Sequence, residues 1–62
     1  MNKSITVGMR LFDEGNGRYI TVNDVKYLIF SCLVEEITEN GETVITGNQL
    51  FTEVELRHFK EL

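Results

Sequence analysis

Residues 35–46 read EEITENGETVIT, and this stretch decides the fold. Asn40-Gly41 is the strongest two-residue signal for a β-hairpin, because both residue types accept a positive φ. The segments that enter and leave this pair are rich in β-branched residues, which favour strands. With a two-residue turn, Ile37 lies opposite Val44 and forms a good cross-strand pair. We therefore expect an antiparallel hairpin centred on this turn.

An earlier hairpin is indicated on the N-terminal side. Residues 7–12 read VGMRLF and residues 18–22 read RYITV, and in both segments one side of the alternation is mostly apolar. The loop between them, residues 13–17, ends in Gly-Asn-Gly, which favours a reversal. Directly after the second strand, Asn23-Asp24 predicts a further turn.

Residues 25–34 read VKYLIFSCLV and fit two structures. Apolar side chains recur at helical spacing, and Asn23 or Asp24 is a candidate helix cap. Against a helix, the segment is rich in β-branched and aromatic residues, and acids follow it at the unfavourable end of a helix dipole. We expect one long strand, apolar on both faces and shared between two halves of a barrel; a helix is the alternative.

The C-terminal part carries a helix signal. Residues 52–55 read TEVE, a capping box, and Phe51 before it and Leu56 after it fit a hydrophobic staple. These signals predict a short helix over residues 53–61. A single helical turn followed by a last strand over residues 57–62 is the alternative.

The fold class that follows is mainly β: a small antiparallel barrel or curled sheet of four to five strands with a short C-terminal helix or helical turn. A chain of 62 residues has room for a single small globular domain, residues 1–62. No apolar run approaches the roughly 18 residues of a membrane span. Residues 1–8 lack the apolar run of a signal peptide, so we expect a cytoplasmic protein without membrane contact.

Charge divides the chain in two. It holds ten acids and six Lys or Arg residues, with a net charge of −4 and a pI of about 4.8. Residues 32–62 hold seven acids and two bases, a net of −5, whereas residues 1–31 hold four bases and three acids, a net of +1. This polarity orients the molecule in the field of a partner.

The sequence offers no catalytic or metal-binding constellation. Cys32 is the single cysteine and His58 the single histidine, so neither a disulfide scaffold nor a four-ligand zinc site is available. We expect Cys32 to be a buried small hydrophobe and His58 a surface residue. Residues 13–24 have the length of an EF-hand loop, but glycines stand where side-chain ligands are needed. We expect no enzymatic activity, no cofactor and no metal.

Basic residues and tyrosines alternate in the N-terminal half, and this pattern marks candidate partner-binding residues. A face of this kind stacks on bases or holds a phosphate backbone when it binds nucleic acid. The candidates are Arg10, Arg18, Tyr19, Lys26 and Tyr27.

The order of elements supplies a resemblance. Residues 6–11 (TVGMRL) and 17–22 (GRYITV), then an apolar strand and a hairpin, then residues 51–56 (FTEVEL), together resemble small SH3-like barrels of the Tudor/KOW kind. The resemblance covers most of the chain and rests on element order without a diagnostic motif. It implies a binding module for peptides, nucleic acid or larger machines. The chain departs from the pattern in having no Trp for a proline-peptide groove and in its low pI.

The expected function is therefore a non-enzymatic small module that binds another protein, in the setting of an accessory protein of a bacterium or a mobile element. An exposed strand edge is one route of contact, with a partner's strand or with a second copy in a homodimer. One alternative is an acidic decoy that inhibits a nucleic-acid enzyme. The other is weak nucleic-acid binding through Arg10, Arg18, Tyr19 and Lys26, which the net negative charge opposes.

Overall fold

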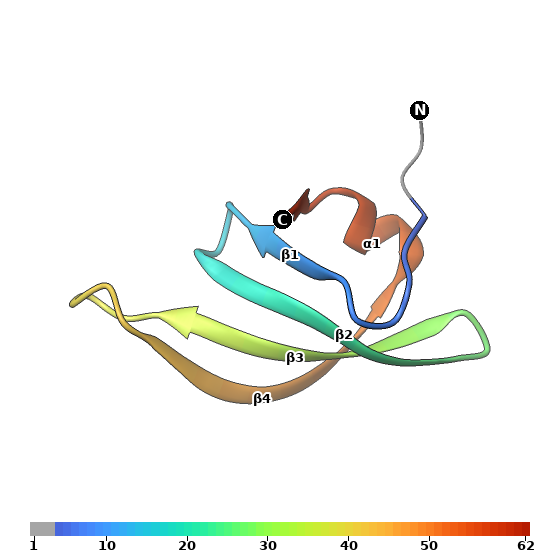
Figure 1. Cartoon of the computed structure of the whole chain (residues 1–62), viewed down its shortest axis with the longest axis horizontal. Helices are drawn as coiled ribbons and strands as arrows, with labels where there is room; N and C mark the ends of the chain where they lie inside the picture. Colours follow the sequence, from blue (N-terminus) through green and yellow to red (C-terminus); the bar gives the residue numbers. More distant parts are fainter. Residues whose placement is uncertain (1–3) are drawn as a thin grey trace.

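The computed structural model describes residues 4–62; residues 1–3, where the segment judged unlike a signal peptide begins, lie outside the described residues. The chain forms one antiparallel sheet with the strand order β4-β3-β2-β1-β5 (Figure 1). The elements are β1 (Arg10–Asp13), β2 (Arg18–Lys26), β3 (Ile29–Ile37), β4 (Thr43–Thr52), α1 (Glu53–Arg57) and β5 (Lys60–Glu61). The predicted fold class, a curled antiparallel sheet of five strands with a short C-terminal helix, is confirmed; the sheet is curled but not closed.

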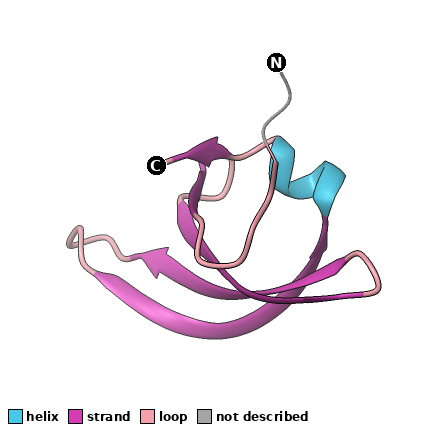
Figure 2. Ribbon diagram, turned by 45° about the vertical axis from the view of Figure 1, so that its right-hand side comes forward, coloured by secondary structure: helices cyan, strands magenta, loops and turns pink. Residues whose placement is uncertain are grey.

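The sheet curls around a core that α1 covers from the concave side (Figure 2). Alternate residues of the strands point into this inner face, as the period of two requires. The buried apolar residues that form the described core are Ile5, Leu11, Ile20, Val22, Phe30, Cys32, Val34, Phe51 and Leu56. The opposite, outer face of the sheet carries the side chains that alternate with them; most of these are half-buried along the central strands and exposed along β4 and near the β2–β3 turn.

The end of the chain follows the second of the two alternatives drawn from its sequence, a short helical turn followed by a last strand. Thr52 caps α1 and the predicted capping box with Glu55 is present. The helix has five residues and stops at Arg57, so the predicted extension to residue 61 is wrong. Phe59 packs edge-to-face on Phe51, with ring centroids 5.7 Å apart. Directly after Phe59, the chain forms β5, which pairs with β1.

The predicted hairpin at residues 35–46 exists, but its predicted register is wrong. Ile37 lies opposite Thr43 rather than Val44. Gly41 N–H donates to the Thr38 carbonyl at 2.9 Å and Gly41 has a φ of 84°. The reversal is therefore a three-residue loop with glycine in the left-handed position, which shifts the pairing by one residue.

The predicted single strand over residues 25–34 is also wrong, although its β character is confirmed. The chain reverses within this segment at Tyr27-Leu28, so its residues belong to two strands, β2 and β3. The expected turn at Asn23-Asp24 is instead a β-bulge, because Val22 pairs with Cys32 and Asp24 pairs with the next residue along β3, Ser31. The predicted pairing of residues 7–12 with residues 18–22 is confirmed, with β1 beginning at Arg10 and backbone hydrogen bonds joining Gly8 and Met9 to Val22.

Candidate functional site

The tip of the β2–β3 hairpin departs from the ordinary chemistry of a tight turn. Lys26 pairs with Ile29, which leaves a two-residue loop of Tyr27 and Leu28. Both loop residues have positive φ, 53° and 64°, as a type I′ turn requires. Asn and Gly fill such positions in most hairpins, since a bulky L-residue is strained there by roughly 1–2 kcal/mol.

These two strained residues also expose large side chains. Tyr27 is 87% exposed and Leu28 is 81% exposed. Neither side chain is buried in the core, so packing within this chain does not explain their presence at the turn. Strained backbone of this kind is concentrated at functional positions, which makes the tip the candidate site.

The bulge in β2 arranges the side chains beside the tip. Asn23 is the extra residue, and after it the alternation of β2 is reset. As a result Asp24 and Lys26 lie on the outer face of the sheet, across from Ser31 and Ile29 of β3. Without the extra residue, these two charged side chains would point into the inner face.

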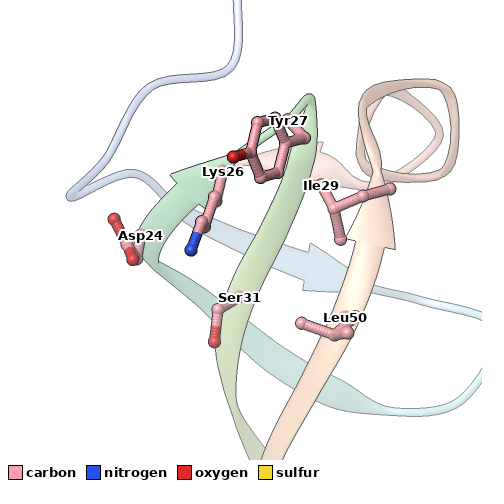
Figure 3. A pocket seen from close by; sticks show the side chains of 6 residues that line it. All are labelled: Asp24, Lys26, Tyr27, Ile29, Ser31 and Leu50. Carbon is pink, nitrogen blue, oxygen red and sulfur yellow. The ribbon is translucent and has the colours of Figure 1, made fainter.

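A hollow of about 400 Å³ lies on the outer face next to the tip (Figure 3). Three adjacent strands and the turn contribute to its lining. The residues that line it are Asp24, Lys26, Tyr27, Ile29, Ser31 and Leu50. We call this set, together with Leu28, the tip patch.

The tip patch is an apolar floor with a charged border. Ile29 and Leu50 supply aliphatic surface from β3 and β4, and Leu50 is 66% exposed. The Lys26 ammonium lies 5.6 Å from the centre of the Tyr27 ring, within the range of a cation–π contact. The arrangement is suited to receiving an apolar side chain while the border fixes its orientation by hydrogen bonds and charge.

Lys26 and Tyr27 are the two candidate residues from the sequence that the structure brings into this patch. Arg10 and Tyr19 lie elsewhere: the Arg10 guanidinium carbon is 4.7 Å from the centre of the Tyr19 ring. Six residues of β2 lie between Tyr19 and Lys26, a span of about 23 Å at the ordinary rise of a strand. The five candidates therefore do not form one contiguous face.

The two arginines among the candidates have partners within the chain. An Arg10 nitrogen lies 3.1 Å from Glu35 Oε1, and Arg18 Nε lies 2.9 Å from Asp13 Oδ2. Arg18 also donates to Gln49 Oε1 at 3.2 Å. These contacts reduce the positive charge that the two side chains offer to an outside anion.

Cys32 and His58 lie in different environments. Cys32 is fully buried in the core, and this burial raises the pKa of its thiol to about 11. His58 is the exposed C-cap of α1. Among residues 4–62, no group of three or more His, Cys, Asp or Glu side chains is placed to hold a metal ion. In the segment with the length of an EF-hand loop, residues 13–24, the Asp13 carboxylate accepts hydrogen bonds from Arg18 and Asn16.

Sequence reasoning missed most of the tip patch. Asp24, Leu28, Ile29, Ser31 and Leu50 were not among the candidates. The sequence did hold one signal for the patch. Residues 25–34 are apolar on both faces, and in an open sheet one of these faces is exposed to water. The exposed Ile29 and Leu28 belong to that segment.

Comparison of the chain with models of protein families, with curated proteins and with solved structures found no match. Within the part of the chain that the structure describes, no helix has the length and apolar character needed to cross a bilayer.

Proposed function

We propose that this protein is a non-enzymatic binding module that recognises another protein through the tip patch. The observation that carries the proposal is the pair Tyr27 and Leu28, which hold positive φ and expose large side chains at the same turn. Exposed aromatic and aliphatic anchors beside a hollow are typical of the energetic centre of a protein interface. We place the protein in the cytoplasm, as an accessory protein of a bacterium or a mobile element.

The form of the hollow favours a protein segment over a small molecule. Pockets for small ligands enclose most of the ligand surface. Here the hollow lies on the solvent side of the sheet, and its anchors Tyr27 and Leu28 project away from the core. The occupant that fits is a partner segment that inserts an apolar side chain against Ile29 and Leu50 and packs on the Tyr27 ring.

The topology is in keeping with a small SH3-like barrel as the type of module. The strand order β5-β1-β2-β3-β4, with a helical segment directly before the last strand, supports this assignment. A scaffold of this kind presents its loops and edges for recognition, while its core is filled by side chains.

The test is capture of partners by the tagged protein and by two variants. In the tip variant, Tyr27→Asn and Leu28→Gly remove both anchors and install the turn residues that type I′ geometry favours. The matched control is Val54→Gln, which changes an apolar residue of α1 that is 64% exposed and lies outside the patch. Circular dichroism of all three proteins checks that they are folded.

We expect one stoichiometric protein partner to be recovered with the wild type and the control and to be lost with the tip variant. Equal recovery by the tip variant and the control overturns the proposal. Recovery of nucleic acid in place of a protein, with a mobility shift at low salt, supports the nucleic-acid alternative instead.

A further inference from the structure

The β4 edge of the sheet is long and lacks the usual protection of edge strands. β4 has ten residues and lies at one end of the strand order, so among the described residues only β3 pairs with it. An unpaired edge presents free backbone N–H and C=O groups to other strands. Natural edges are commonly guarded by charged side chains or proline, and β4 contains neither.

The opposite edge shows the contrast. β5 has two residues, too short to offer a template for pairing. In β4 the one irregularity is the bulge at Thr46, which lies between the paired positions Ile45 and Gly47. The Thr46 hydroxyl donates to the Val34 carbonyl at 3.4 Å, so the bulge is fastened to β3. The uninterrupted part of the edge is residues 47–52.

We propose that two copies of this chain pair antiparallel through residues 47–51 of β4 and join their sheets into one. The inference rests on the β4 edge; it shares Leu50 with the tip patch but does not require the proposed function. The absence of charge along β4 favours a second copy as the occupant. A twofold interface brings residues close to the axis near their own counterparts, and like charges that oppose each other there are unfavourable. β4 carries no charged residue, so two copies of it can pair without such a repulsion.

The acids that flank β4 disfavour one register. Glu42 precedes the strand and Glu53 follows it, and pairing about the strand midpoint would bring these two acids together. Centring on Gln49, in the middle of residues 47–51, keeps Glu42 and Glu53 of opposite copies apart and leaves the bulge at Thr46 outside the paired segment.

Centring on Gln49 has a second consequence on the outer face. Leu50 lies opposite Asn48 of the other copy, so the two Leu50 side chains become diagonal neighbours across the axis. Each is 66% exposed in the single chain. Their contact covers part of this apolar surface, which a small domain with a limited core gains stability from burying. Both hollows then lie on the same side of the joined sheet.

The first experiment measures mass in solution by sedimentation equilibrium over a range of concentrations. We expect the wild type to approach twice the 7.2 kDa of the single chain. Leu50→Lys places two ammonium groups close together across the axis and weakens the dimer about tenfold or more. Val54→Lys makes the same change in charge at a residue of α1 that is 64% exposed, and it leaves the dimer intact.

The second experiment locates the axis by cross-linking. Gln49→Cys places two thiols directly opposite each other and gives a covalent dimer on mild oxidation, whereas Thr43→Cys gives none. Both variants are made on a Cys32→Ala background, because Cys32 pairs directly with Gln49 across β3 and β4 and would otherwise offer a disulfide partner within the same chain. A wild type that stays monomeric at all concentrations, a Leu50→Lys variant that dimerises like Val54→Lys, or efficient cross-linking of Thr43→Cys but not Gln49→Cys overturns the proposal.

Discussion

Arg18 Nε lies 2.9 Å from Asp13 Oδ2 and fastens the loop between β1 and β2. The same carboxylate oxygen accepts from Asn16 Nδ2 at 2.9 Å, and the Asp13 carbonyl accepts from the Gly17 N–H at 2.8 Å. Burial of Asp13 disfavours its charged form, but the hydrogen bonds from Asn16 and Arg18 and the charge of Arg18 outweigh burial and lower its pKa. The carboxylate is thus a structural anchor of the loop.

Replacing this anchor is expected to destabilise the protein in a manner that depends on pH. Asp13→Asn removes the charge that Arg18 pairs with and lowers the free energy of unfolding by about 1–3 kcal/mol at neutral pH. Because the folded pKa is lowered, the contribution of Asp13 is present above the unfolded value of about 3.9 and is lost as pH falls through the folded value.

Urea denaturation at several pH values measures this effect. The difference between wild type and Asp13→Asn is expected to be constant near neutrality and to shrink as the pH falls below about 4. The control, Glu14→Gln, changes an exposed neighbour and stays within about 0.5 kcal/mol of wild type. A difference that grows toward acid pH contradicts the role given to Asp13.

The capping box of α1 is expected to hold the C-terminal segment in place. Thr52 Oγ1 accepts from the Glu55 N–H at 3.3 Å, and Glu55 Oε1 accepts from the Thr52 N–H at 2.8 Å. Thr52→Ala removes the first bond and costs about 1 kcal/mol of unfolding free energy, while Thr52→Ser retains it. Chemical denaturation compares the two variants; equal stability shows that the cap is dispensable.

Thr21 carries a hydroxyl that its surroundings do not use. Its Oγ1 is shielded and has no hydrogen-bond partner within the described chain. Thr21→Val keeps the shape and removes the unpaired group, so we expect a gain in stability of up to about 1 kcal/mol. The same change at Thr46, whose hydroxyl donates to the Val34 carbonyl, brings no such gain. Thermal unfolding distinguishes the two variants, and a destabilised Thr21→Val protein refutes the expectation.

The Cys32 thiol is expected to be inert in the folded protein. Burial raises its pKa to about 11, so the reactive thiolate is scarce at neutral pH, and the sulfur is inaccessible as well. Alkylation followed by mass spectrometry is expected to label Cys32 only in denaturant. Labelling of the native protein at the rate of a free cysteine contradicts its place in the core.

The parts of the fold that local sequence predicts are those where local preference and tertiary structure agree. Thr52 and Glu55 form their box because the interaction involves residues three apart. Asn40-Gly41 marks its hairpin, yet the register was missed, since Gly41 alone takes the positive φ and Glu39 joins the loop. Two residues suffice to predict that the chain reverses here. The register of the two strands depends in addition on whether Asn40 takes a positive φ, which the sequence does not specify.

The Tyr27-Leu28 turn shows why the site was harder to predict than the fold. Turn preferences oppose a reversal at Tyr-Leu, so the segment looked continuous. The basic residues and tyrosines lie close together in the sequence and so suggested one face. In the structure, Lys26 and Tyr27 lie at one end of β2, whereas Arg10 and Tyr19 lie near its other end. Leu50 joins the patch through the β3–β4 pairing and carries no local signal.

The central claim is that Tyr27 and Leu28 occupy the hairpin tip for recognition and at the expense of stability. The most direct measurement is the free energy of unfolding of the Tyr27→Asn/Leu28→Gly variant against that of wild type. Since both side chains are largely exposed and both residues have positive φ, the account predicts a variant more stable by about 1–2 kcal/mol. A variant that is less stable than wild type would show that the two residues are there to support folding, and would contradict the claim.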